Sequence, residues 1–199
     1  MSRHILTGAP GAGKTVILRG LERAGLAVVE EAATDVIAWA DATGVERHWE
    51  DPGFCDAILA LQQQREANAP AGTVIFDRSP VCTLALSRFL GRDPSAALQQ
   101  AAAGCRARYA PAVFFIESLP TIVNTAARRI TLEEALRFGA LHREVYVDLG
   151  FRLIDVPPGP AAERRDAVLG QIPGSTDHPN FRSSRRTPGP SSKGAVGPA

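Results

Sequence analysis

The chain has 199 residues, of which 45% are hydrophobic and 22% are charged, and its formal net charge at pH 7 is +1. This length and composition favour one soluble domain with a core of ordinary size. Three cysteines, Cys55, Cys82 and Cys105, lie far apart with no C-x-x-C pair, which argues against a disulfide framework and a zinc site. No apolar stretch resembles a signal peptide or a membrane span, so we expect a cytoplasmic protein without a membrane partner.

The charge is unevenly spread along the chain. From Pro173 onward four basic residues stand against one acidic residue, and this surplus of three leaves residues 1–172 mildly acidic at −2. We therefore do not expect a nucleic-acid partner. Pro, Gly, Ser and Arg dominate after Ile172, which predicts a folded domain over residues 1–172 and a disordered tail over residues 173–199. A basic arm that contacts an anionic partner is the alternative interpretation of the tail.

The first predicted elements surround a phosphate-binding motif. A strand at residues 5–7 and a helix from Val16 flank residues 8–15, which match G-x-x-x-x-G-K-[ST] without a mismatch. Glycines let successive backbone N–H groups point at an anion, Lys14 reaches the β- and γ-phosphates, and the Thr15 hydroxyl coordinates Mg²⁺. The motif thus predicts binding of ATP with Mg²⁺. The predicted nucleotide-binding residues are Gly8, Ala9, Pro10, Gly11, Ala12, Gly13, Lys14, Thr15 and Val16.

The second predicted strand, residues 26–30, is followed by Glu31. One of the two carboxylates, Glu30 or Glu31, is a candidate to accept a proton from a substrate hydroxyl or to hold a substrate group. Strand alternation sends them to opposite faces, and the sequence leaves open which one faces the site. Acidic residues that favour a helix start are the alternative. On the following stretch we expect Trp39 in the core, and Trp49 beside a substrate pocket.

After a predicted helix at residues 54–68, the third strand, residues 74–76, ends on Asp77. A buried strand that ends in Asp is typical of a Walker-B carboxylate, which binds Mg²⁺ directly or through water. The next residue, Arg78, is a candidate to stabilise the transferred phosphoryl group. A capping Asp paired with its neighbour is the alternative. Ser79 and Pro80 then predict a helix start.

A helix at residues 95–109 and a strand at residues 113–116 precede Arg128 and Arg129. These two arginines are candidates for a mobile lid that reaches the phosphates, although adjacent arginines on a solvated loop fit the pattern nearly as well. Thr131 and Glu134 then predict a capping box, and the helix should end at Gly150, before a strand at residues 151–155.

Five short apolar strands that alternate with helices predict a three-layer α/β/α sandwich around a parallel sheet. Ligands bind such sheets beyond the carboxyl ends of the strands, which is where the phosphate loop and the polar clusters above are expected.

Residues 8–15, 29–33, 76–80 and 128–129 together resemble the small stand-alone AAA-type ATPases, which are similar to the ribosylnicotinamide kinase domain and, more distantly, to deoxynucleoside kinases. The likeness covers most of residues 1–172. It implies a five-stranded parallel sheet of order 2-3-1-4-5, with a substrate beside the second and third strands. It also implies that Glu31 is the base or substrate anchor, and that Asp77 and Arg78 serve Mg²⁺ and phosphate. Thr34 stands where such proteins often carry Arg.

Two functions fit these observations. The first is Mg·ATP-dependent phosphoryl transfer to a small hydroxylated, nucleoside-like metabolite. The second is a regulatory ATPase, or nucleotide switch, that recruits a protein partner and has no small-molecule acceptor. The chain lacks an N-K-x-D guanine-reading segment and has no room for a separate helical lid domain. We therefore expect a monomer or small homo-oligomer that binds a nucleoside triphosphate, not a GTPase or a hexameric ring.

Overall fold

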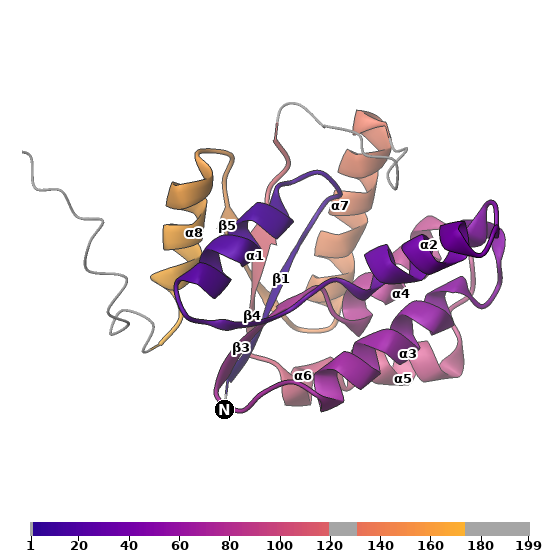
Figure 1. The fold of residues 1–199 in the computed structure, drawn as a ribbon, viewed down its shortest axis with the longest axis horizontal. Helices are drawn as coiled ribbons and strands as arrows, with labels where there is room; N and C mark the ends of the chain where they lie inside the picture. The colour runs from indigo at the N-terminus through magenta and orange to yellow at the C-terminus, as the bar shows by residue number, and fades with distance from the viewer. Residues whose placement is uncertain (1, 120–130, 174–199) are drawn as a thin grey trace, which may run out of the picture.

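The computed structural model describes residues 2–119 and 131–173, so Arg128, Arg129 and nearly all of the predicted tail lie outside the described residues. Five parallel strands form one sheet in the order β2-β3-β1-β4-β5 (Figure 1). The predicted strand order 2-3-1-4-5 is therefore confirmed. The strands are β1 (Ser2–Gly8), β2 (Ala27–Val29), β3 (Thr73–Asp77), β4 (Ala112–Ile116) and β5 (Arg152–Val156).

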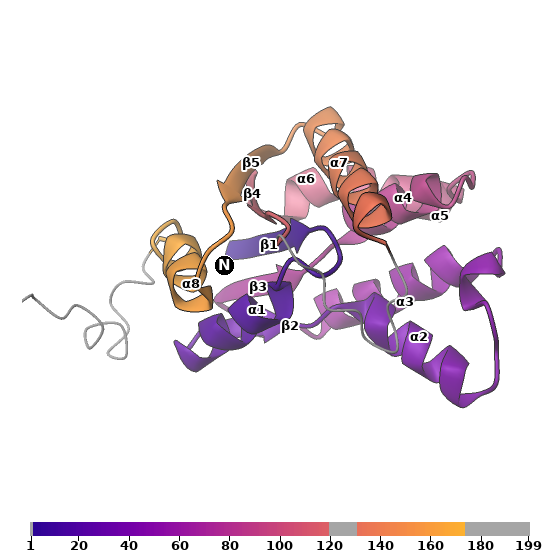
Figure 2. The same cartoon turned by 90° about the horizontal axis from the view of Figure 1, so that it is seen from above.

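Helices cover both faces of this sheet, as Figure 2 shows: α1 and α8 lie on one side, and α3, α4, α5 and α7 lie on the other. In the part of the chain that the structure describes, no helix is both long and apolar enough to cross a membrane. The helices are α1 (Lys14–Arg23), α2 (Ala32–Ala42), the 3-10 helix η1 (His48–Glu50), α3 (Phe54–Ala67), α4 (Pro80–Phe89), α5 (Ala96–Ala103), α6 (Cys105–Arg108), α7 (Leu132–Asp148) and α8 (Ala161–Leu169).

Alternate residues of the central strands supply two separate hydrophobic cores. Ile5 of β1 and Phe76 of β3 pack against α3, α4 and α7, whereas their neighbours Leu6 and Ile75 pack against α1 and α8. Successive side chains of a strand point to opposite faces, so both faces must be apolar when helices cover both. This explains why the strands are almost continuously apolar in sequence.

Local signals set the helix ends largely as expected. Ser79 caps α4 by accepting a hydrogen bond from the Val81 amide, and Thr131 and Glu134 form the complete capping box of α7. Gly150 follows α7 with a φ of 78°. The predicted helix at residues 95–109 differs: α5 ends at Gly104, and the short α6 follows it.

The central position of β1 brings the polar strand ends together. Leu6 of β1 is in register with Asp77 of β3, and Gly8 is in register with Ile116 of β4. A Cβ on Gly8 would lie 2.2 Å from the Ile116 carbonyl oxygen, and the φ of Gly8 is 138°. Only glycine fits where the chain leaves β1 this close to β4. The phosphate loop therefore begins beside the carboxyl ends of both neighbouring strands.

Candidate active site

The phosphate loop lies between the end of β1 and the start of α1, which is Lys14. Gly11 and Gly13 adopt left-handed backbone angles, with φ of 77° and 83°. The Lys14 side chain is buried against the loop, and its Nζ donates hydrogen bonds to the carbonyl oxygens of Gly8 (3.1 Å) and Ala9 (2.8 Å). The first N–H groups of α1 face this loop, and a helix N-terminus with a buried ammonium group attracts anions. The residues present therefore fit a bound triphosphate.

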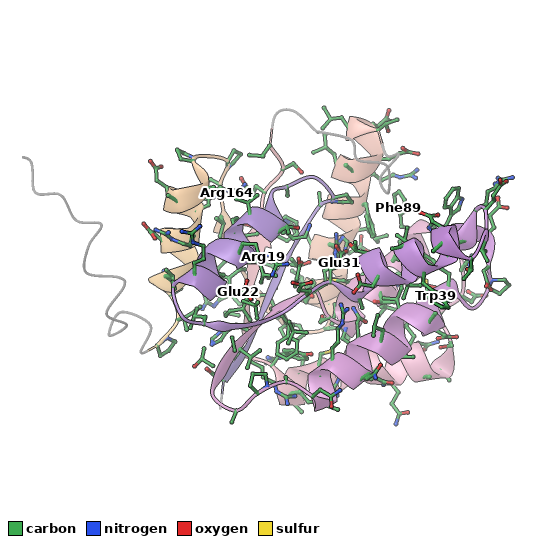
Figure 3. The ribbon with its side chains drawn as sticks, viewed as in Figure 1. Arg19, Glu22, Glu31, Trp39, Phe89 and Arg164 are labelled. Atoms are coloured by element: carbon green, nitrogen blue, oxygen red, sulfur yellow. The ribbon has the colours of Figure 1, made fainter. Side chains whose placement is uncertain are left out.

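A second buried cation, Arg164 of α8, supports the loop from behind (Figure 3). Its Nη1 donates to the Ala12 carbonyl at 2.8 Å, and its Nη2 donates to the Glu117 carbonyl at 2.7 Å. Burial lowers the pKa of this guanidinium, which the neighbouring Glu117 partly offsets. Sequence reasoning missed Arg164, because its partner Ala12 lies 152 residues away and no local pattern marks the contact.

Two oxygen-bearing residues lie at the edge of the sheet where Mg²⁺ is expected. Asp77 ends β3 and is 6% exposed, and Thr15 is the second residue of α1. Hydroxyl and carboxylate oxygens are the ligands that Mg²⁺ prefers. Among the residues described, no group of three or more His, Cys, Asp or Glu side chains is placed to hold a metal ion. The side chains of Thr15 and Asp77 thus fit a Mg²⁺ ion whose remaining ligands are phosphate and water oxygens.

Arg78 follows Asp77 in a left-handed conformation, with a φ of 74° that is rare for a residue other than glycine. Its amide donates to the Leu6 carbonyl at 2.9 Å, and its Nε lies 2.5 Å from Oε1 of Glu31. Burial opposes charge on this guanidinium, but Glu31, Cys82 and Asp77 outweigh it and raise the pKa of Arg78. Arg78 is therefore a buried, permanently charged cation. The hydrogen bond to Leu6 holds its strained backbone, and the ion pair with Glu31 holds its side chain.

The structure distinguishes the two carboxylates that follow β2. Glu30 forms an exposed ion pair with Arg19 of α1, whereas Glu31 pairs with Arg78, and its side chain is 14% exposed against 51% for Glu30. Figure 3 shows Glu31 at the centre of the molecule, between the sheet and α2. The Thr34 hydroxyl donates to Oε2 of Glu31 at 3.2 Å. Thr34 thus helps to orient the Glu31 carboxylate.

Behind Arg78 lies His142 of α7, a fully buried residue that sequence reasoning also missed. Its Nε2 is 3.0 Å from Nη1 of Arg78, and its Nδ1 is 2.9 Å from the Phe138 carbonyl. Burial, and then the charge of Arg78, lower the pKa of this imidazole well below its usual value. His142 is therefore neutral at pH 7.

A cavity of about 940 Å³ opens beside these groups. Pro10 of the phosphate loop, Glu31 and Arg78 are among the residues that line it. Apolar side chains line most of its walls, and they come from α2, α3, α4 and α7. They include Ile37, Phe54, Ile58, Leu86, Phe89 and Phe138.

The two tryptophans lie in different surroundings. Trp49 of η1 lines the cavity and packs edge-on to His48, with 4.9 Å between the ring centroids. The expectation that Trp39 packs in the core is wrong, because its side chain is 73% exposed on the outer face of α2 (Figure 3). Ala32 is the one fully buried residue of α2, and this helix packs against the core through Ala33, Val36 and Ile37 instead of Trp39.

The structure therefore brings five of the predicted site residues to one edge of the sheet, Lys14, Thr15, Glu31, Asp77 and Arg78. A phosphate loop after a central strand, with an Asp-Arg pair ending the adjacent strand, defines a P-loop domain of the kinase-like class. The chain belongs to the AAA domain family, whose pattern it matches over residues 3–164.

Solved structures with the same fold support this class. A NadR protein in complex with NR superposes with a TM-score of 0.65 at 17% identity, covering 85% of this chain and 51% of that one. Shikimate kinase from Acinetobacter baumannii in complex with shikimate gives 0.55 at 15% identity, covering 85% and 91%. Deoxyadenosine kinase from M. mycoides gives 0.55 at 14% identity, covering 85% and 97%. No curated protein matches the chain in sequence.

At sequence identities of 14–17%, these similarities establish a shared fold and nothing beyond it. The chain spans about half the length of the NadR protein, 51% in both the complex with NR and the complex with NAD and AMP-PNP.

Proposed function

We propose that this protein transfers the γ-phosphoryl group of Mg·ATP to a hydroxyl group of a small, nucleoside-like acceptor. One observation carries the proposal: the phosphate loop, Glu31 and Arg78 all line one cavity, so an acceptor in that cavity adjoins the phosphate site. Its aromatic walls suit the flat base of a nucleoside. Structures of the same fold with NR, with AMP-PNP or with deoxynucleotide products support this choice.

The nucleotide would bind through the loop amides and Lys14, whose ammonium group already lies inside the loop. Thr15 and Asp77 would hold Mg²⁺, which supplies positive charge to the phosphates when it is bound. Lid arginines at Arg128 and Arg129 belong to the same proposal, on the sequence alone. Most of the catalysis would come from positioning and electrostatics.

The acceptor step would use Glu31 and Arg78. A bond forms between the acceptor oxygen and the γ-phosphorus, while the bond from that phosphorus to the β–γ bridging oxygen breaks and ADP leaves. Glu31 accepts the hydroxyl proton, and Arg78 stabilises the charge on the transferred group. The ion pair between Glu31 and Arg78 places the base and the cation side by side at the cavity. The apolar cavity walls would keep water from competing with the acceptor.

A panel of nucleosides, sugars and vitamin precursors tests this function. With Mg·ATP, ADP release should rise when the right acceptor is added, and the Glu31→Gln variant should lose at least about 100-fold in turnover while it still binds ATP. The Glu30→Gln variant is the matched control and should keep its rate. Lys14→Ala should abolish nucleotide affinity. Slow turnover that no acceptor stimulates would support the regulatory ATPase instead, and an unaffected Glu31→Gln rate would remove Glu31 from the chemistry.

A further inference from the structure

The contacts of His142 define its protonation state. The Phe138 carbonyl can only accept a hydrogen bond, so Nδ1 of His142 carries a proton. The guanidinium of Arg78 can only donate, so Nε2 of His142 carries none. Only the neutral tautomer protonated at Nδ1 satisfies both partners.

This imidazole supplies the second of two anchors on the Arg78 side chain. Glu31 contacts Nε of the guanidinium, and His142 contacts Nη1. A planar group held at one atom can pivot about that atom, whereas contacts at two different nitrogens define its orientation. The contact at Nε is an ion pair, and the contact at Nη1 is a hydrogen bond.

The two anchors come from different elements of the fold. Glu31 immediately precedes α2, and His142 belongs to α7, whose residues Glu134 and Phe138 line the cavity two turns and one turn earlier. Nδ1 of His142 is in turn fixed by the backbone of Phe138 itself. The orientation of Arg78 therefore depends on how α7 packs against the cavity.

We propose that His142 is a positioning residue, which holds the guanidinium of Arg78 in the orientation that receives the transferred phosphoryl group. The proposal rests on the proposed function, because it assigns His142 a role through Arg78. A purely structural histidine would fill the same volume in the core without any effect on how Arg78 meets a ligand.

Two substitutions separate the two hydrogen bonds of His142. His142→Asn places an amide near the position of Nδ1, where it can reach the Phe138 carbonyl but not Arg78. His142→Gln extends an amide oxygen toward the position of Nε2, where it can accept from Arg78. Tyr146→Phe is the packing control, because Tyr146 is buried one turn later on the same face of α7 and bonds Ser79 and Cys82.

The measurement uses the full chain and needs no acceptor. Calorimetry compares binding of Mg·ADP with binding of Mg·ADP plus aluminium fluoride, which mimics the transferring phosphoryl group. In the wild-type protein the fluoride should tighten binding. In His142→Asn, aluminium fluoride should tighten binding about tenfold less than in the wild type, as expected for the loss of one charged hydrogen bond. Its affinity for Mg·ADP alone should stay within about twofold, and His142→Gln and Tyr146→Phe should keep the gain.

Other results would overturn the role of His142 or that of Arg78. If His142→Asn keeps the full gain, or Tyr146→Phe loses as much, His142 is a packing residue and the inference is overturned while the proposed function stands. If Arg78→Lys also keeps the gain, the role proposed for Arg78 fails, and that of His142 fails with it. Should His142→Asn not fold, calorimetry with His142→Gln decides: that variant should keep the gain, and loss of the gain overturns the inference.

Discussion

The guanidinium of Arg164 donates a 2.8 Å hydrogen bond to the carbonyl of Ala12, 152 residues earlier in the chain. The same side chain donates to Glu117 beyond the end of β4, so one residue of α8 joins the phosphate loop to the sheet. A Cβ on Gly13 would lie 3.3 Å from Nη1 of Arg164, which shows how closely the loop is supported.

Removal of this support should weaken nucleotide binding. We expect Arg164→Gln to lower the affinity for Mg·ATP about tenfold and to destabilise the protein by about 2 kcal/mol, because two buried carbonyl groups lose charged donors. A fluorescent ATP analogue and thermal unfolding measure the two effects. Arg165→Gln is the control, since Arg165 pairs only locally with Asp166 in the contacts described and should leave nucleotide binding unchanged.

A methyl group on Gly8 should be far more harmful than one on Gly44. Both glycines have positive φ, but a Cβ on Gly8 meets the Ile116 carbonyl oxygen at 2.2 Å, whereas nothing lies within 4 Å of one on Gly44. Gly44→Ala should cost about 1–2 kcal/mol from backbone strain alone, and Gly8→Ala should cost more than about 4 kcal/mol. Urea unfolding compares them, and equal losses would contradict the predicted clash.

Stability should fall as the pH drops below the usual pKa of histidine. Burial and the charge of Arg78 lower the pKa of His142 below its ordinary value of 6.5, with Lys14 acting in the same direction and Glu31 opposing it. Below pH 6.5, His142 binds a proton in the unfolded chain but stays neutral in the folded protein. His142 therefore reduces stability as the solution becomes more acidic.

Because His142 binds only one proton, its effect on the free energy of unfolding has an upper limit. The free energy of unfolding should decrease by up to about 1.4 kcal/mol per pH unit between pH 6.5 and the pKa of folded His142, and His142→Gln should remove that part of the slope. Burial also lowers the pKa of His4, so a slope from that residue should remain. Denaturation at several pH values measures both, and an unchanged slope in His142→Gln would contradict the prediction.

Trp49 and Trp39 should respond differently to truncation. Trp49 lines the cavity, and Trp49→Ala should raise the KM for the acceptor about tenfold through the loss of aromatic contact area. Trp39→Ala removes a ring that is 73% exposed and outside the cavity lining, so KM should not change. The comparison is made once the panel has identified an acceptor, and equal effects would place the acceptor elsewhere.

Sequence patterns predicted the parts of this molecule that depend on local chemistry. The glycines and Lys14 of the phosphate loop, the Ser79 cap and the capping box at Thr131 each involve residues close together in the chain, and the apolar strands show their period directly. The strand order came from the family resemblance that these motifs support. Strand alternation also separated Glu30 from Glu31 but did not identify the inner one, because that depends on where Arg78 lies.

The parts that sequence reasoning missed depend on packing between distant segments. Arg78 and His142 are 64 residues apart, and nothing near either one marks the contact. The sequence favours the core for Trp39, yet its side chain on α2 is exposed. A buried polar side chain is recognisable only when its partners are known, and the partners of Arg164 come from two other elements.

The capping box at Thr131 sets the start of α7 through contacts between residues that are close together in the chain. Its reciprocal hydrogen bonds with Glu134 start the helix at a defined residue, and every later position follows from 3.6 residues per turn. Glu134 and Phe138 therefore line the cavity, and His142 contacts Arg78 one turn after Phe138. One reciprocal cap at the start of α7 thus determines which of its side chains line the cavity and which one contacts Arg78.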